Sequence, residues 1–316
     1  MMHLLTSAAP ACLLLTLVAL LPARAGNWPQ WRGPRGDGIS HETGIPLQWG
    51  QRQNVVWKIR ILGVGHSSPI VWGDTLLLTS AEPDSKQRQL LKIDKPGREV
   101  SHLPPLIVHS AGKDQAIVSG SSQILSIAPE TGHVFWTCRG PSDVCVTSLV
   151  FGHDLVFATG GYPERTRMAV RTTGSGDVTA SHVVWSSKKA VSYVPSPVFS
   201  GNHVYSILDN GIVYCLDAAD GHIVWEKRIG GHHRASLVLV DGNLMATNDQ
   251  GVTTVFRATP KRYEQIAEND LGEFCYATPA VAGGRIYIRT ENHLYCIAGR
   301  SDRHASAPMP QRPSCE

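Results

Sequence analysis

The sequence predicts an all-β protein, a β-propeller of about six four-stranded antiparallel blades. Short apolar strands separated by tight turns recur along the chain with a period of roughly 40–50 residues, which is typical of propeller blades. Each repeat also begins and ends with the same kind of sequence. A β-sandwich would explain many short strands, but it does not require repeated beginnings and ends, so the propeller is favoured.

The clearest repeat ends at Gly231. It predicts four strands, at Pro197–Phe199, His203–Tyr205, Ile212–Leu216 and His222–Trp225. The run Ile212–Leu216 is apolar, β-branched and aromatic, which indicates a strand buried on both faces. Between the second and third strands, Asn210-Gly211 predicts a two-residue type I′ turn, because both residues accept positive φ angles.

Every repeat opens on a small hydroxylated residue followed by Pro or Leu. This opening signature occurs at Ser68-Pro69, Ser148-Leu149, Ser196-Pro197, Ser236-Leu237 and Thr278-Pro279, with a weaker copy at Pro104-Pro105. The repeats close on tryptophan, as in Trp136, Trp185 and Trp225. Trp57 has the closing form without a repeat before it, whereas the last repeat ends at Ile297 without a closing strand. We therefore predict that the strand around Trp57 completes the last blade, closes the ring and removes an exposed edge.

Two segments resemble the tryptophan-docking repeat of the PQQ-like (quinoprotein-type) β-propellers: Leu216–Trp225 and Ala128–Trp136. Trp28-Pro29-Gln30-Trp31 and the ending Leu294–Ile297 are similar to the exported bacterial, BamB-like members of that family. The resemblance implies that tryptophans stack between neighbouring blades, here Trp57, Trp136, Trp185 and Trp225. Such relatives usually carry about eight blades. This chain has material for six, and the shortening is expected near Lys95 to Pro105.

Residues 1–25 have the form of a signal peptide. A short apolar run, Ala11–Leu21, precedes Ala23-Arg24-Ala25, which is an A-x-A cleavage sequence before Gly26. The run is too short to span a membrane as a helix. The sequence therefore predicts export and a periplasmic or secreted location for the mature protein.

Three segments follow the predicted leader. Residues 26–53 are rich in Trp, Pro and Gly and predict an irregular strap that is anchored by buried aromatic side chains. Residues 54–299 form the propeller. Residues 300–316 are polar and Pro-rich, which indicates a disordered tail.

The composition argues against nucleic-acid binding, because the formal net charge is only +3 and phosphate binding needs a basic surface. Cys215 and Cys296 occupy matching third-strand positions, which predicts two buried thiols that act as small hydrophobic side chains. Cys138 and Cys145 flank a Gly-Pro loop, and the sequence leaves open whether they form a disulfide or stay free.

The residues do not match an enzyme. In the quinoprotein-type family, PQQ binding is associated with an adjacent cysteine pair, a calcium site of carboxylates and Asn, and a Trp plane under the quinone. No Cys-Cys pair and no suitably spaced acidic cluster occur, so no cofactor is expected and PQQ is disfavoured. Adjacent His232 and His233 would point to opposite faces of a strand, so metal binding is not expected either.

Binding is expected in the connections from each outer strand to the next inner strand, because propeller loops carry function while the blades hold them. The candidate residues are Lys188, Lys189, Tyr193, His232, His233, Arg234 and Tyr276, and the same connections contain His66, Arg139 and Glu273. The sequence thus predicts an exported, non-catalytic, monomeric scaffold without a membrane span that recognises a protein or an envelope polymer. The alternative is a degenerate quinoprotein-type oxidoreductase, or another enzyme with an unrecognised site.

Overall fold

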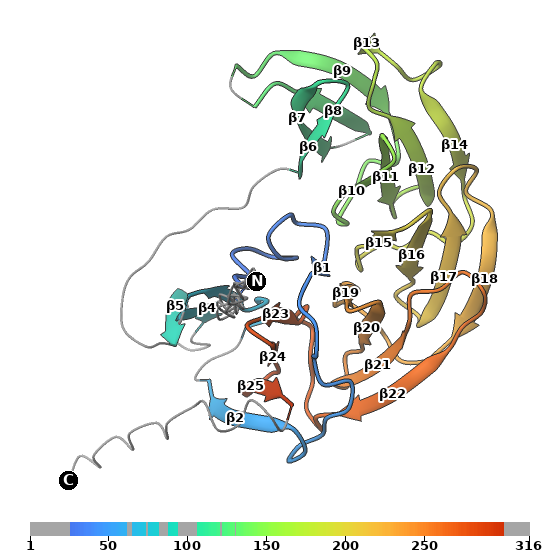
Figure 1. Cartoon of the computed structure of the whole chain (residues 1–316). Helices are drawn as coiled ribbons and strands as arrows, with labels where there is room; N and C mark the ends of the chain where they lie inside the picture. Colours follow the sequence, from blue (N-terminus) through green and yellow to red (C-terminus); the bar gives the residue numbers. More distant parts are fainter. Residues whose placement is uncertain are drawn as a thin grey trace, which may run out of the picture.

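The structure, a computed structural model, describes residues 26–61, 65–73, 75–81, 88–93, 106–120, 122–129 and 131–299. In this part of the chain the strands form six sheets, and Figure 1 shows them side by side around an arc. The all-β propeller prediction is confirmed. No helical segment of the described residues has the length and hydrophobicity of a membrane span. The predicted signal peptide and the predicted C-terminal tail lie outside the described residues.

The sheets follow the chain, and each is built from consecutive antiparallel strands. The first contains β3 (Ile70–Trp72), β4 (Thr75–Ala81) and β5 (Arg88–Ile93). The second contains β6 (Leu106–Ser110), β7 (Lys113–Gly120), β8 (Gln123–Ile127) and β9 (Val134–Arg139). The third contains β10 (Val150–Gly152), β11 (Leu155–Gly160), β12 (Thr166–Arg171) and β14 (Val183–Ser187).

The other three sheets repeat this plan. The fourth contains β15 (Val198–Ser200), β16 (His203–Ile207), β17 (Ile212–Asp217) and β18 (Ile223–Arg228). The fifth contains β19 (Val238–Val240), β20 (Asn243–Thr247), β21 (Val252–Arg257) and β22 (Gln265–Asp270). The sixth contains β23 (Ala280–Ala282), β24 (Arg285–Arg289) and β25 (His293–Ala298). Two short strands add in parallel at sheet edges, β13 (Gly176–Asp177) on β9 and β1 (Ile39–Ser40) on β19.

The sixth sheet is completed from the N-terminal side of the propeller, as the sequence predicts. Strand β2 (Val55–Arg60) pairs antiparallel with β25, and Trp57 lies opposite Cys296. The carboxylate of Glu273 reinforces this pairing, because it lies 3.1 Å from Lys58 Nζ on β2 and accepts a 3.2 Å hydrogen bond from the Tyr295 hydroxyl on β25. The sixth sheet thus combines β2, which comes before the other five sheets in the sequence, with β23, β24 and β25, which come after them.

The first and second sheets lie at the two ends of the arc, although they are consecutive in the sequence (Figure 1). Residues 94–105, which connect them, are outside the described part and include the region where shortening is predicted. Within the described residues the first sheet has three strands, with β5 at its outer edge. The described sheets therefore form an arc. Strand β2 connects the sixth sheet to the first, and the arc is open between β5 and β6.

The fourth sheet tests the local predictions. The central residues of β17 are buried on both faces, as predicted. The type I′ turn is wrong: Gly211 has φ of 76°, but Asn210 is not in the left-handed region. The loop has three residues, 209–211, because the Leu208 amide donates to the Ile212 carbonyl (2.9 Å) and the Gly211 amide donates to the Leu208 carbonyl (3.0 Å). The longer loop needs fewer left-handed residues than a two-residue type I′ turn.

The strap runs through the middle of the arc, where Figure 1 places β1. Trp28 exchanges two 2.8 Å backbone hydrogen bonds with Val71 of the first sheet, and β1 pairs with the innermost strand of the fifth. Trp28 and Trp49 are buried, as predicted for the strap. Arg32 is buried as well, and its guanidinium donates to the backbone oxygens of Pro197, Gly36 and Asp37. Burial lowers the pKa of Arg32 to about 10.

Candidate functional site

The opening signatures are connected by a hydroxyl ladder, a chain of hydrogen bonds between the first residues of neighbouring sheets. The backbone amide of each residue donates to the side-chain hydroxyl of its counterpart in the next sheet, over 2.9 to 3.0 Å. The order is Ser148, Ser196, Ser236, Thr278 and Ser68. The small hydroxylated residue of each repeat thus joins two sheets, and it holds the preceding connection at a defined place.

Two residues before each ladder residue lies an equivalent position, on the connection that leads into an inner strand. We call these five positions the inner rim: His66, Val146, Val194, Arg234 and Tyr276. The strap contacts the opposite ends of the same inner strands, since Glu42 binds the turn that follows β23 and Asn27 binds the turn that follows β3. Asn27 and Glu42 of the strap therefore lie on the face opposite the inner rim.

Three inner-rim residues from consecutive sheets stack on one another. The guanidinium carbon of Arg234 lies 4.9 Å from the centre of the Tyr276 ring. The His66 ring packs edge-on against the same tyrosine, with 4.6 Å between the ring centres. Arg234 and His66 are exposed and Tyr276 is half-buried. A cation over an aromatic face is stabilised by the ring quadrupole, so this stack presents a pre-ordered combination of cationic and aromatic groups to solvent.

Apolar side chains on these connections are exposed as well. Phe274, on the same connection as Tyr276, is 47% exposed, and Val146 of the inner rim is also 47% exposed. Aromatic side chains and Arg are enriched in the cores of protein interfaces, where they contribute most of the binding energy. The arrangement is suited to binding a macromolecular surface.

The predicted candidates Lys188, Lys189 and Tyr193 lie on a different connection, between β14 and β15. Lys188 Nζ lies 2.9 Å from the Glu164 carboxylate, and both side chains are largely exposed. Tyr193 covers Gly161 so closely that a Cβ atom at Gly161 would overlap its ring. The structure thus separates these residues from the stack, and the seven predicted candidates do not form one cluster.

The adjacent histidines of the next connection have different environments. His232 is exposed, whereas His233 is only 2% exposed. The ring nitrogens of His233 lie 2.9 Å from the Gly230 carbonyl and 3.1 Å from the Thr247 carbonyl. Burial lowers the pKa of His233. This side chain holds the connection that carries Arg234, and it is not available to a partner.

Arg289 was not predicted from the sequence. It is 1% exposed, and within the described part of the chain none of its three guanidinium nitrogens has a hydrogen-bond partner. Burial lowers its pKa. The thiol of Cys275, whose pKa burial raises to about 12, contacts the Arg289 carbonyl at 3.2 Å. The sequence offers one sign of this burial. Arg289 ends the strand Arg285–Arg289 at a position where the alternation of the strand would allow a side chain to face the core.

Closing tryptophans dock on the following sheet. Trp185 Nε1 donates to the Ala218 carbonyl and Trp225 Nε1 donates to the Thr259 carbonyl, both over 2.9 Å. Both indoles are half-buried. Gly221 lies against the Trp185 ring, where a Cβ atom would be 2.6 Å away. At this junction the tryptophan of the third sheet packs on the glycine turn of the fourth.

The other two predicted docking tryptophans differ in their contacts. Trp136 is fully buried and donates to Gln115 Oε1 of its own sheet (3.0 Å), while Gln115 Nε2 donates to the Thr172 carbonyl near the third sheet (3.1 Å). Trp57 is half-buried and packs against Tyr287 of the sixth sheet, with 6.2 Å between ring centres. The hydrogen bonding from Trp136 to the next sheet is therefore relayed by Gln115.

The residues do not fit a quinone and calcium site. Among the described residues, the potential metal ligands that gather in a group of three are Asp217, Asp220 and His222. They lie in the outer turn between β17 and β18, and the two carboxylates accept backbone amides of that turn. At the middle of the arc, Trp28 and Arg32 of the strap are buried instead.

The described cysteines are free thiols. Cys138 and Cys145, for which the sequence allowed either state, are unpaired. Cys215 and Cys296 are fully buried, as the sequence predicts. These two thiols fill the interior and are not accessible to a partner.

Two overlapping stretches of the chain, residues 50–227 and 95–305, match the model of the family described as outer membrane protein assembly factor BamB. The chain belongs to this family. Membership in the BamB family confirms the resemblance to PQQ-like propellers that the docking repeats indicate. No protein with a curated description matches the chain.

Several solved structures are similar to this member of the BamB family. BamB from Moraxella catarrhalis has 10% sequence identity and a TM-score of 0.37, over 78% of this chain and 97% of that chain. The computationally designed Ika8 protein has 11% identity and a TM-score of 0.45, over 74% and 71% of the two chains. A europium-containing methanol dehydrogenase has 12% identity and a TM-score of 0.45, over 84% and 68%.

Proposed function

We propose that this protein is an exported, non-catalytic propeller that recognises a protein partner in the cell envelope through the Arg234–Tyr276–His66 stack of its inner rim. The stack itself is the observation that carries the proposal. It places an exposed cation, an aromatic ring and a histidine from three sheets in direct contact. The family is described as outer membrane protein assembly factor BamB. This description supports a partner that takes part in outer-membrane protein assembly.

Packing does not require the exposed residues of the stack. Arg234 and His66 are exposed, in contrast to the ladder residues beside them. Their ordering by Tyr276 lowers the conformational entropy that binding would otherwise remove. Phe274, on the same connection as Tyr276, supplies exposed apolar area.

Site-specific photo-crosslinking in exporting bacteria tests this function. A photoreactive amino acid at position 276 is expected to give a covalent adduct with an outer-membrane assembly protein, identified by mass spectrometry. The same group at Tyr162, which is 63% exposed on another connection, serves as the control. Equal adducts at both positions, or none at position 276, would contradict the proposal.

A matched pair of variants tests which connection contributes. Arg234→Glu should reduce partner capture at least tenfold, while the unfolding temperature changes little because the Arg234 side chain is exposed. Lys188→Glu with Lys189→Glu is the control on the β14–β15 connection and should leave capture unchanged. A loss of capture confined to the lysine variant would place the site there instead.

The non-catalytic part of the proposal has its own test. Adding PQQ and calcium to the purified protein should give no dye-linked oxidation of alcohols or sugars above the rate without protein. A protein-dependent rate would favour the oxidoreductase alternative.

A further inference from the structure

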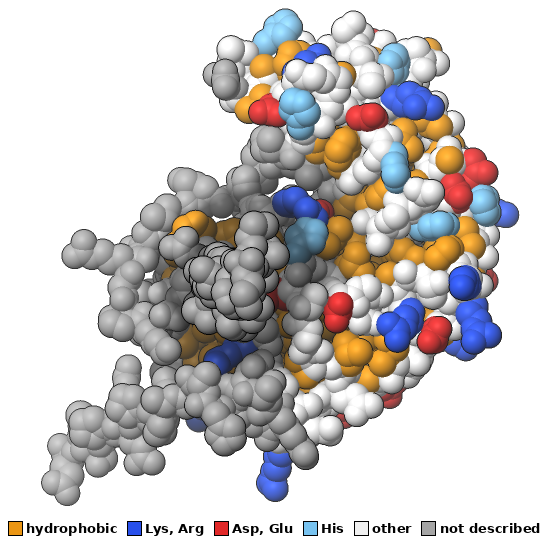
Figure 2. All heavy atoms as spheres, viewed as in Figure 1, with side chains coloured by type: hydrophobic (Ala, Val, Ile, Leu, Met, Phe, Trp, Pro, Cys, Tyr) orange, Lys and Arg blue, Asp and Glu red, His pale blue; other side chains and the backbone are white. Residues whose placement is uncertain are grey.

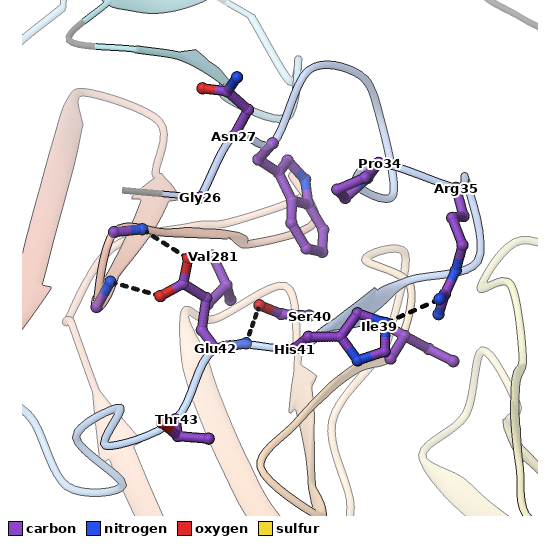
Figure 3. Close-up of a pocket in the computed structure, with 13 residues that line it drawn as sticks. Gly26, Asn27, Pro34, Arg35, Ile39, Ser40, His41, Glu42, Thr43 and Val281 are labelled. Atoms are coloured by element: carbon purple, nitrogen blue, oxygen red, sulfur yellow. Dashed lines mark hydrogen bonds between the residues drawn. The ribbon is translucent and has the colours of Figure 1, made fainter. Parts of the chain in front are cut away.

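Glu42, directly after β1 in the strap, holds its carboxylate in a fixed position. Its two oxygens accept the backbone amides of Gly283 and Gly284, over 3.0 and 2.9 Å. These glycines form the turn between β23 and β24 of the sixth sheet. Figure 3 shows the carboxylate pointing at this turn across the base of a pocket. Because both oxygens are bound to backbone, the side chain is not free to rotate away.

Gly26 lies against this carboxylate. A Cβ atom at Gly26 would be 2.1 Å from Glu42 Oε1. The backbone nitrogen and a Cβ atom on the same α-carbon are about 2.5 Å apart, so the Gly26 nitrogen is within about 5 Å of Oε1. The contact leaves no room for a side chain on the residue at position 26.

The residues after Gly26 keep it in place. Asn27 Oδ1 accepts the Gly73 amide over 2.7 Å, and Trp28 is paired with Val71 through two backbone hydrogen bonds. Trp28 is 1% exposed. The position of Gly26 relative to Glu42 is therefore determined by the first sheet on one side and the sixth sheet on the other.

The pocket around Gly26 and Glu42 has a volume of about 770 Å³, and its lining includes Arg35, His41 and Glu42. Arg35 is engaged elsewhere. Arg35 Nε lies 2.8 Å from the Asp37 carboxylate, and Arg35 Nη1 lies 2.8 Å from His41 Nε2. Among the described residues, no cation forms an ion pair with Glu42. The Glu42 carboxylate can therefore form an ion pair with a positive charge at Gly26.

We propose that Glu42 is the acceptor for the α-ammonium group that leader removal creates at Gly26, and that this ion pair fastens the strap between the first and sixth sheets. The inference rests on the export part of the proposed function. Hydrolysis of the Ala25–Gly26 peptide bond by a leader peptidase adds water: Ala25 leaves as a carboxylate, and the Gly26 nitrogen gains protons and becomes cationic. Cleavage thus turns a neutral amide beside Glu42 into its charge partner.

The test uses the full chain expressed in an exporting bacterium. Mass spectrometry of the purified protein is expected to find Gly26 as the first residue. The α-amino pKa, measured from the pH dependence of its reaction with an amine reagent, should exceed the usual value of about 8. Glu42→Gln should return it to about 8, whereas Glu291→Gln, which changes an exposed glutamate on the loop between β24 and β25, should not. Any other first residue, or an unchanged pKa in Glu42→Gln, would overturn the inference.

A second variant removes the charge from its position without touching Glu42. Insertion of one glycine before Gly26 moves the ammonium group along the chain, and its pKa should fall to about 8. The α-amino pKa is raised in the folded state, so its contribution to stability is present below about pH 8 and is lost as pH rises through the folded value. At pH 7 the inserted form should therefore unfold about 2–4 °C lower, with no difference at pH 11. Equal unfolding temperatures of the two forms at pH 7 would contradict the ion pair. Partner crosslinking at position 276 tests the proposed function separately.

Discussion

At the scale of single residues, the two adjacent histidines show how burial separates chemically equal side chains. His232 is exposed, and His233 is enclosed between the carbonyls of Gly230 and Thr247. A neutral imidazole can donate through one nitrogen only. Protonation would allow a second hydrogen bond, but it would also put a charge in a buried site, and burial is the larger effect on the pKa of His233.

This environment predicts a pH dependence of stability. The pKa of His233 is lower in the folded state than in the unfolded state, where it is about 6.5, so the unfolded chain binds more protons in this range. The free energy of unfolding should fall as the pH is lowered from 7.5 to 5. His233→Gln should reduce that dependence and His232→Gln should not, measured by denaturant unfolding at each pH. Identical profiles for the two variants would show that His233 does not titrate in this way.

At the scale of the blade, the docking turn explains why the repeat contains glycine. Gly221 has φ of 74°, and the Trp185 ring of the preceding sheet lies against it. Gly132, the equivalent residue of the second sheet, has φ of 71°, but no described atom lies within 4 Å of a Cβ atom built there. Gly132 has no such neighbour because the described first sheet ends at β5, before any closing strand with a tryptophan.

The two glycines therefore form a matched pair. Both Gly221→Ala and Gly132→Ala place a side chain at positive φ, which costs about 1 kcal/mol. Gly221→Ala also displaces the Trp185 indole, and such overpacking costs a further 1–3 kcal/mol. Gly221→Ala should thus lower the free energy of unfolding clearly more than Gly132→Ala, as measured by urea titration. If both variants lose the same amount, tryptophan docking is not what requires Gly221.

At the scale of the whole molecule, residues distant in the sequence hold the arc together. Strand β2 completes the last sheet, the hydroxyl ladder continues from Ser148 to Ser68, and Arg32 of the strap reaches Pro197, 165 residues away. These links join the N-terminal part of the chain to the fourth, fifth and sixth sheets. Between β5 and β6 the described residues show no such link.

A cross-strand disulfide tests the β2–β25 pairing. Lys58 and Tyr295 lie directly opposite each other, so Lys58→Cys with Tyr295→Cys should form a bond under oxidising conditions, seen as faster migration on a non-reducing gel. Oxidation should stabilise this variant by about 2–4 kcal/mol relative to its reduced form, because the bond closes a very long loop. Lys58→Cys alone should stay reduced, since neighbouring Cys296 points to the other face of the sheet. Failure of the double variant to oxidise would mean that the strands are not paired in this register.

The sequence alone determined the repeat, the strand positions, the closing role of β2 and the buried state of Cys215 and Cys296, because alternation and turn chemistry act within one blade of neighbouring residues. It did not determine which connections meet. Arg234, Tyr276 and His66 belong to three repeats, and only the ladder between their neighbours brings them together. The strap was predicted to have buried aromatic anchors, yet Arg32 and Glu42 owe their positions to backbone groups of sheets far along the chain. A backbone amide or carbonyl carries no sequence signal of its own, so these contacts exist only once the sheets have assembled.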